Sequence, residues 1–220
     1  MNKRRTLAEL SLLVCLILAM VVPLNPARGG LKGSRHDFSA ASWNPGGQLC
    51  QPCHTPHTGS KTVPLWNHDN SIASFTMYNN TANSQNSPAA EQPSSVSLSC
   101  LSCHDGVTAL DAFGGNAGTW NIANAPDGYR PSSSLGTDLS SDHPISIDYT
   151  TSIALDDKGL YDPKTAPSGL PAGGSISKDM LYNGRVECSS CHDVHNKMGI
   201  SRMLKKDNAG SALCLTCHDK

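Results

Sequence analysis

The chain has 220 residues, with 17 basic and 18 acidic side chains and only three Phe, three Trp and five Tyr. This length favours one domain or two small ones, and the balanced charge gives no basic surface for nucleic acid and little attraction to anionic lipid. With so few large apolar side chains, the polypeptide alone cannot bury enough apolar surface to form a core for its size.

The N-terminus has the features of a secretory signal peptide at residues 1–29. Basic residues at positions 3–5 precede the apolar run 12–22, which is too short to span a bilayer comfortably. The small residues within the tripeptide 27–29 fit a cleavage site. We therefore expect an exported protein whose mature part, 30–220, has no membrane span and carries 13 basic and 17 acidic side chains.

All eight cysteines of the mature part lie in Cys-x-x-Cys-His motifs, the attachment motif of c-type haem. On one helical turn, residues i and i+3 project side by side, so both sulfurs can bond the two vinyl groups of one haem. The histidine that follows becomes an axial (proximal) ligand of the iron. Four motifs predict four covalently attached haem c groups: Cys50, Cys53 and His54; Cys100, Cys103 and His104; Cys188, Cys191 and His192; Cys214, Cys217 and His218.

Zinc is the alternative occupant of these cysteines, in two sites of four cysteines each. Zinc does not require a histidine at the same offset four times, whereas haem attachment does. No cysteine of the mature part is left over for a disulfide framework. Covalent haem is therefore the favoured interpretation.

No window of the mature part sustains a long helical or strand periodicity. Short helices are predicted at 95–103 and 211–218, which carry the second and fourth motifs. Pro52 allows a helical turn at the first motif only near the start of that turn. Polar stretches rich in Pro and Gly are predicted to be loops: residues 79–99, 126–136 and 162–175.

These features predict a mostly irregular, haem-cored multihaem cytochrome c fold, with short helices at the CxxCH sites and few short strands. The first and third motifs extend to Cys-x-x-Cys-His-x-x-His, whereas the second and fourth do not. We interpret this as a duplication within a single tetrahaem domain at 30–220. Its halves are expected at about 30–135, with haems 1 and 2, and 136–220, with haems 3 and 4.

Five further histidines are candidates for the distal axial position on the four irons: His36, His57, His68, His143 and His195. This surplus favours histidine on both faces of each iron, which gives low-spin haems of low reduction potential that are closed to substrates. Methionine is the alternative ligand and would raise the potential of its haem; Met198 and Met203 are the nearest candidates.

The position of each histidine in the sequence suggests how it can serve. His57 and His195 lie three residues beyond a proximal histidine, on the wrong side of its ring to reach the other face of the same iron. Each can serve only a different haem, or else is exposed to solvent. His143 precedes a proline that favours extended backbone, with a turn histidine as the alternative. His36 lies near the mature N-terminus, and His68 is the spare candidate.

The order and flanks of the motifs resemble a known family. The stretches that carry this resemblance are residues 33–37, 53–57, 64–67, 100–106, 111–115, 135–136, 139–146, 188–195 and 211–218. On these residues the mature part resembles the multihaem cytochromes with doubled Cys-x-x-Cys-His motifs, and more closely the outer-membrane tetrahaem cytochromes of the OmcE type.

The resemblance implies an extracellular filament. Members of this type polymerise so that their haems stack along the fibre and carry electrons to minerals or partner cells. In related filaments the extra histidine of the first motif ligates a haem of the next protomer. The matching residue here is His57, and the implied partner is the haem on Cys214 and Cys217.

Electron transfer without further chemistry is the leading hypothesis for the function. It would occur in a homopolymer outside the cell or on its outer surface, which exchanges electrons with redox partner cytochromes and external acceptors. A monomeric periplasmic tetrahaem shuttle is the alternative, and a multihaem reductase with one open haem face is a third hypothesis. We expect no enzyme, because no motif replaces its histidine with lysine and distal histidines are in surplus.

Overall fold

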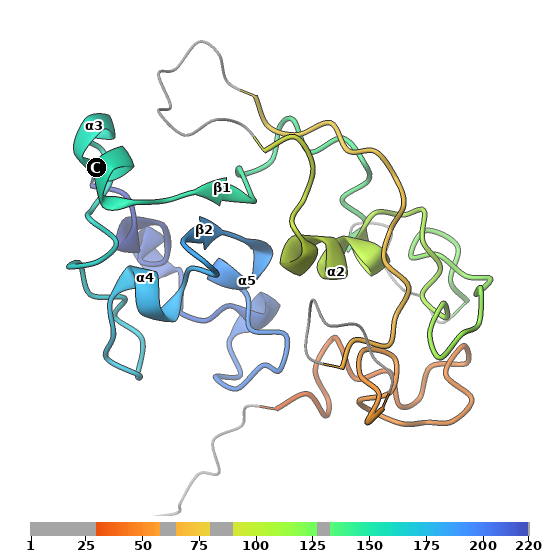
Figure 1. Cartoon of the computed structure of the whole chain (residues 1–220). Helices are drawn as coiled ribbons and strands as arrows, with labels where there is room; N and C mark the ends of the chain where they lie inside the picture. The colour runs from red at the N-terminus through yellow and green to blue at the C-terminus, as the bar shows by residue number, and fades with distance from the viewer. Residues whose placement is uncertain (1–29, 58–64, 80–89, 127–132, 220) are drawn as a thin grey trace, which may run out of the picture.

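The computed structural model of the chain describes residues 30–57, 65–79, 90–126 and 133–219, and most of these form turns and irregular segments (Figure 1). The predicted mostly irregular fold with short helices and few strands is confirmed. The described elements are the helices α2 (Ser95–His104), α3 (Thr151–Asp157), α4 (Ile176–Asp179) and α5 (Cys188–Cys191), the strands β1 (Ile147–Asp148) and β2 (Arg185–Val186), and the 3-10 turns η2 (Ser201–Met203), η3 (Ala209–Ser211) and η4 (Cys214–Thr216).

Helix α2 carries the second motif. Ser94, in extended conformation, caps its N-terminus, and no proline follows until the helix has ended. Leu101 faces the interior and is fully buried, together with the small side chains of Ser97 and Ser102. Asp105 caps the C-terminus, and Gly106, with a φ of +75°, turns the chain away. The predicted helix at 95–103 is confirmed.

The loop predicted at 79–99 is wrong at its C-terminal end, because α2 begins at Ser95. Residues 80–89 of that stretch lie outside the described residues, as do residues 127–132 of the loop predicted at 126–136. The loop predicted at 162–175 is confirmed, since this segment forms turns and one isolated bridge between Pro167 and Ser175.

The α-helix predicted at 211–218 is wrong. The segment contains only the 3-10 turn η4, Cys214–Thr216, preceded by η3. Gly210 and Ser211 have φ values of +60° and +63°, so the backbone is left-handed where the predicted helix would start. The six residues that remain before the chain turns at His218 are too few to sustain an α-helix without support from packing.

The small sheet places the third motif. Strands β1 and β2 are antiparallel, with Ile147 opposite Val186 and Asp148 opposite Arg185. Helix α5 begins two residues after β2 ends, and α5 packs against α2 (Figure 1). The second and third motifs are therefore brought together where α2 contacts α5.

The buried apolar side chains of the described residues form three small clusters rather than one core. One cluster contains Trp43, Leu110 and Phe113 and packs against Cys103. The largest groups Tyr149, Ile176, Met180 and Leu213 with Cys191 and Cys217 around it, and the third joins Phe75, Leu101 and Leu139. Two of the three clusters thus lie against haem attachment cysteines, in agreement with a core completed by haem.

Gly118 occupies a position that admits no side chain. Its φ is +73°, and a Cβ atom there would lie 2.5 Å from Ala109 Cβ and 2.8 Å from the Ala112 nitrogen. We expect Gly118→Ala to lower the free energy of unfolding by roughly 2–3 kcal/mol, from left-handed strain and overpacking together. Gly115→Ala is the matched control, because its φ is +85° but nothing lies within 4 Å of its Cβ position. Chemical denaturation of the haem-loaded variants checks this, and equal destabilisation by both would contradict it.

Candidate haem attachment sites

Each motif lies on a single turn of the chain. At three motifs the backbone N–H of the histidine donates to the carbonyl of the first cysteine: His54 to Cys50 at 2.8 Å, His192 to Cys188 at 3.1 Å and His218 to Cys214 at 3.1 Å. The second motif forms the last turn of α2. One such turn sets cysteines i and i+3 side by side, as attachment of one porphyrin through two sulfurs requires.

Three of the four motif histidines face a second imidazole. The ring centroids are 6.0 Å apart for His104 and His36, 6.2 Å apart for His54 and His195, and 6.3 Å apart for His218 and His143. Two imidazoles on opposite faces of one metal ion, each with its nitrogen about 2.0 Å from the metal, have ring centres roughly 6 Å apart. The three spacings therefore suit pairs of axial ligands.

The fourth motif histidine, His192, makes no ring contact with a second imidazole within the described part of the chain, although His36 lies near enough to interact with it electrostatically. His57 lies on the surface. The resemblance implied that His57 ligates the haem on Cys214 and Cys217, and this inter-protomer ligation stays a prediction. Within the chain, the ring opposite His218 is His143, and the motif histidine without a ring contact to a second imidazole among the described residues is His192.

His68, the spare candidate, is buried beside the second motif. Its side chain is 5% exposed. Nδ1 lies 2.8 Å from the Asp69 carbonyl oxygen, and Nε2 lies 3.2 Å from the Leu110 carbonyl oxygen and 3.5 Å from Cys103 Sγ. His68 thus contacts an attachment cysteine but faces no proximal histidine among the described residues.

Backbone carbonyls orient three of the imidazoles. Nδ1 lies 2.7 Å from the Ser133 oxygen in His104, 3.0 Å from the Arg202 oxygen in His192, and 2.9 Å from the Pro144 oxygen in His143. An N–H at Nδ1 donates to these carbonyls and leaves the Nε2 lone pair for a metal ion. Sequence reasoning missed these acceptors, since every residue type carries a backbone carbonyl.

His36 is held in the neutral state that a metal ligand needs. Burial lowers its pKa from 6.5 to about 4, and the nearby imidazoles of His104 and His192 act in the same direction. The ring therefore keeps a free lone pair at neutral pH. The same electrostatic contacts show that the second and third motifs lie close to His36.

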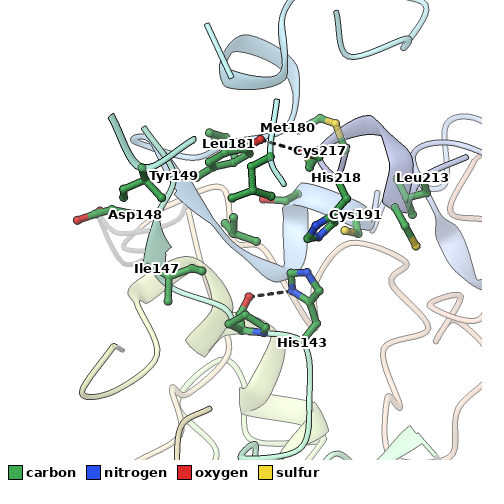
Figure 2. A pocket seen from close by; sticks show the side chains of 16 residues that line it. His143, Ile147, Asp148, Tyr149, Met180, Leu181, Cys191, Leu213, Cys217 and His218 are labelled. Atoms are coloured by element: carbon green, nitrogen blue, oxygen red, sulfur yellow. Dashed lines mark hydrogen bonds between the residues drawn. The ribbon is translucent and has the colours of Figure 1, made fainter. Parts of the chain in front are cut away.

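Residues of the fourth motif line an apolar cavity of about 240 Å³ (Figure 2). Figure 2 shows the His143 and His218 rings pointing toward one another across it. Burial raises the pKa of the Cys217 thiol to about 11, so this cysteine lies in an apolar environment. Apolar side chains line most of the walls, among them Ile147, Tyr149, Ile153, Leu160, Met180, Leu181 and Leu213. Two thiols, two facing imidazoles and apolar walls are the groups that a covalently bound haem requires.

The attachment cysteines within each half lie near one another. Burial raises the pKa of the Cys103 thiol well above its ordinary value, and the neighbouring Cys53 thiol adds to this shift. Burial likewise raises the pKa of Cys191, with Cys214 as the next cause. The first motif is thus close to the second, and the third is close to the fourth.

A direct contact joins the two halves. The thiols of Cys100 and Cys188 interact, and each is the largest cause of the other's pKa change: the pKa of Cys100 is raised and that of Cys188 is lowered to about 7. Groups attached at the four motifs would therefore follow one another in the order 1-2-3-4.

Comparison with protein families gives a match in the C-terminal part of the chain. The profile of the family described as the doubled CXXCH motif matches residues 182–220, which hold the third and fourth motifs. No curated protein matches the chain. None of the helices in the described ranges combines the length and apolar character needed to cross a bilayer. The family match, with the geometry above, supports a multihaem c-type cytochrome that binds haem c covalently.

Proposed function

We propose that the chain is an electron-transfer protein with four haem c groups, each with histidine on both faces of the iron. The observation that carries this proposal is the set of three facing imidazole pairs, with centroids 6.0–6.3 Å apart. Each pair joins a motif histidine to a histidine from elsewhere in the chain. When bound, haem c supplies one-electron redox chemistry.

The chain itself supplies both axial ligands to three of the four sites. The assigned pairs are His54 with His195, His104 with His36, and His218 with His143. Because the distal histidines come from distant parts of the sequence, each pair also holds two chain segments together. Iron with both faces occupied has no position for a substrate, so electron transfer without other chemistry fits these three sites.

The second axial position on the iron at His192 is available to a histidine from another copy of this chain, which favours polymerisation. We infer that His57 of a neighbouring copy of this chain fills it. Three points support this. His57 is exposed, and it follows the first motif at the offset at which His195 follows the third. The resemblance also implies that His57 ligates a haem of another protomer, although there the implied haem is that on Cys214 and Cys217. The proposed product is a homopolymeric, extracellular filament that exchanges electrons with redox partner cytochromes and external acceptors.

The position opposite His192 also fits two alternative functions, a monomeric shuttle and an enzyme. A monomeric periplasmic shuttle could complete its third site with Met203, which is buried, or leave it open. An open iron face would bind small ligands, as an enzyme requires. Binding of carbon monoxide to the ferrous protein separates these cases, since it reports open axial positions.

The purified protein is expected to carry four covalently bound haems, of which three stay low-spin and bind no carbon monoxide. Intact mass and the pyridine haemochrome absorbance count the haems, and ferrous titration counts the open positions. Discrete protomers should bind at most one equivalent, and filaments none. Cys100→Ser with Cys103→Ser is the control and should carry three haems. Binding of two or more equivalents to unmodified protomers would refute the paired assignment.

A further inference from the structure

A buried carboxylate lies where the second and third motifs meet. Glu187 immediately precedes Cys188 and is 2% exposed. Its carboxylate accepts hydrogen bonds from the hydroxyls of Ser94 at 2.7 Å, Ser97, and Ser146 at 3.0 Å. The backbone N–H of Ser190 also donates to it, in the capping box of α5. Four donors from three separate segments therefore converge on one acidic side chain.

The hydrogen-bond pattern around Glu187 suits an anion. Ser146 Oγ accepts from the Ser94 backbone N–H at 2.8 Å, and Ser97 Oγ accepts from the Cys188 N–H at 3.1 Å. Both hydroxyls are thereby turned so that their own protons point to Glu187. Charge-assisted hydrogen bonds of this kind favour a carboxylate.

This charge has no cationic side chain beside it. Among the described residues, Arg185 forms an ion pair with Asp148, and no Lys, Arg or His lies within ion-pair distance of Glu187. Burying an ion costs several kcal/mol when no opposite charge compensates it. Neutral hydrogen-bond donors offset part of this cost, and a nearby positive charge would offset more.

The position of the charge identifies what it acts on. Ser97 lies three residues before Cys100 on α2, and Glu187 is bonded in sequence to Cys188 on α5. These two thiols are the largest influence on each other's pKa values, and the charge of Glu187 acts to raise both pKa values. The carboxylate therefore exerts its field at the attachment points of both central haems.

We propose that Glu187 is a buried anion that lowers the reduction potentials of the two central haems, those on the second and third motifs. This rests on the proposed haem binding. An oxidised haem carries one more positive charge than a reduced one, so a fixed anion in a low-dielectric interior stabilises the oxidised form. The serine donors hold the carboxylate between α2 and α5, close to both haems at once.

Glu187→Gln tests this, because it keeps the shape of the side chain and removes the charge. In a spectroelectrochemical titration of the four-haem protein, we expect two of the four midpoint potentials to rise and the other two to stay unchanged. Glu187→Asp, which restores the negative charge, should leave both of these midpoint potentials near those of the unmodified protein. Glu91→Gln is the matched control, since Glu91 is exposed to solvent and its charge is screened.

Two results would overturn the proposal. One is a folded Glu187→Gln variant with four haems and unshifted potentials. The other is an equal shift in Ser146→Ala, which weakens the same contacts but keeps the charge. Haem count and spin state are measured on the same samples. Unmodified protein that carries fewer than four haems, or haems that are mostly high-spin, would instead refute the proposed function.

A second measurement needs no variant. Glu91 and Glu187 are the two glutamates of residues 30–220, so labelling with ¹³C-glutamate reports on few groups. On reduction of the unmodified protein, the infrared difference spectrum should show a shifted carboxylate band of labelled glutamate. A carboxylic acid band, or no glutamate band at all, would overturn the assignment even if Glu187→Gln failed to fold.

Discussion

His195→Ala is expected to open the haem on Cys50 and Cys53 to external ligands. His195 faces His54 at 6.2 Å with the two rings nearly parallel, at 11°, so its removal leaves that iron with one protein ligand. The ferrous protomer should bind one more equivalent of carbon monoxide than the unmodified protomer, and one haem should become high-spin. Its reduction potential should also rise, because the loss of an imidazole ligand favours the reduced state.

His68→Ala is the matched control for this experiment. His68 is also a non-motif histidine, but it faces no proximal histidine among the described residues, and it contacts Cys103 instead. We expect this variant to lose stability through its buried hydrogen bonds and to keep the carbon monoxide stoichiometry of the unmodified protein. If His68→Ala bound an extra equivalent of carbon monoxide and His195→Ala bound none, His68 rather than His195 would be the distal iron ligand.

His57→Ala is expected to abolish filaments while leaving four attached haems. In the proposed assembly, His57 supplies the ligand that the site at His192 does not receive from its own chain. Each junction between protomers would then lose an iron–nitrogen bond together with the contacts that it orients. Electron microscopy of the secreted fraction should show thin uniform fibres for the unmodified protein and discrete particles for the variant.

Added imidazole separates ligation from simple surface contact. It should bind the open iron of His57→Ala protomers and return their spectra to low-spin without restoring fibres. Fibres that form normally in His57→Ala would contradict the inter-protomer ligand. Discrete particles in the unmodified protein would favour the periplasmic shuttle.

The ligand pairs and the cysteine contacts together define the internal path for electrons. The first motif lies near the second through Cys53 and Cys103, and the third lies near the fourth through Cys191 and Cys214. The Cys100–Cys188 contact joins the two halves. The halves that we expect from the repeat are therefore tied together at their attachment sites, and Glu187 lies at this junction.

Secondary structure was predictable only where local sequence decides it. The second motif stands on α2 as expected, because Ser94 at the N-cap position is extended and no proline interrupts the ten residues that follow. The helix expected at the fourth motif is absent, since left-handed backbone at Gly210 and Ser211 prevents it from starting. The backbone conformation at these two residues depends on how the turn packs, and the hydrophobic periodicity of the sequence does not report it.

The sequence by itself determined where haem can attach and which histidines are available, because covalent attachment requires two sulfurs and an imidazole at one fixed local spacing. Only the tertiary structure decided which imidazoles face each other, which motif histidine has no ring contact with a second imidazole among the described residues, and which carbonyls orient the ligands. The contact of Ser94 with Glu187 spans 93 residues, and that of His104 with the Ser133 carbonyl spans 29. Such pairings depend on how the turns pack around the attachment sites, and local spacing carries no record of that packing.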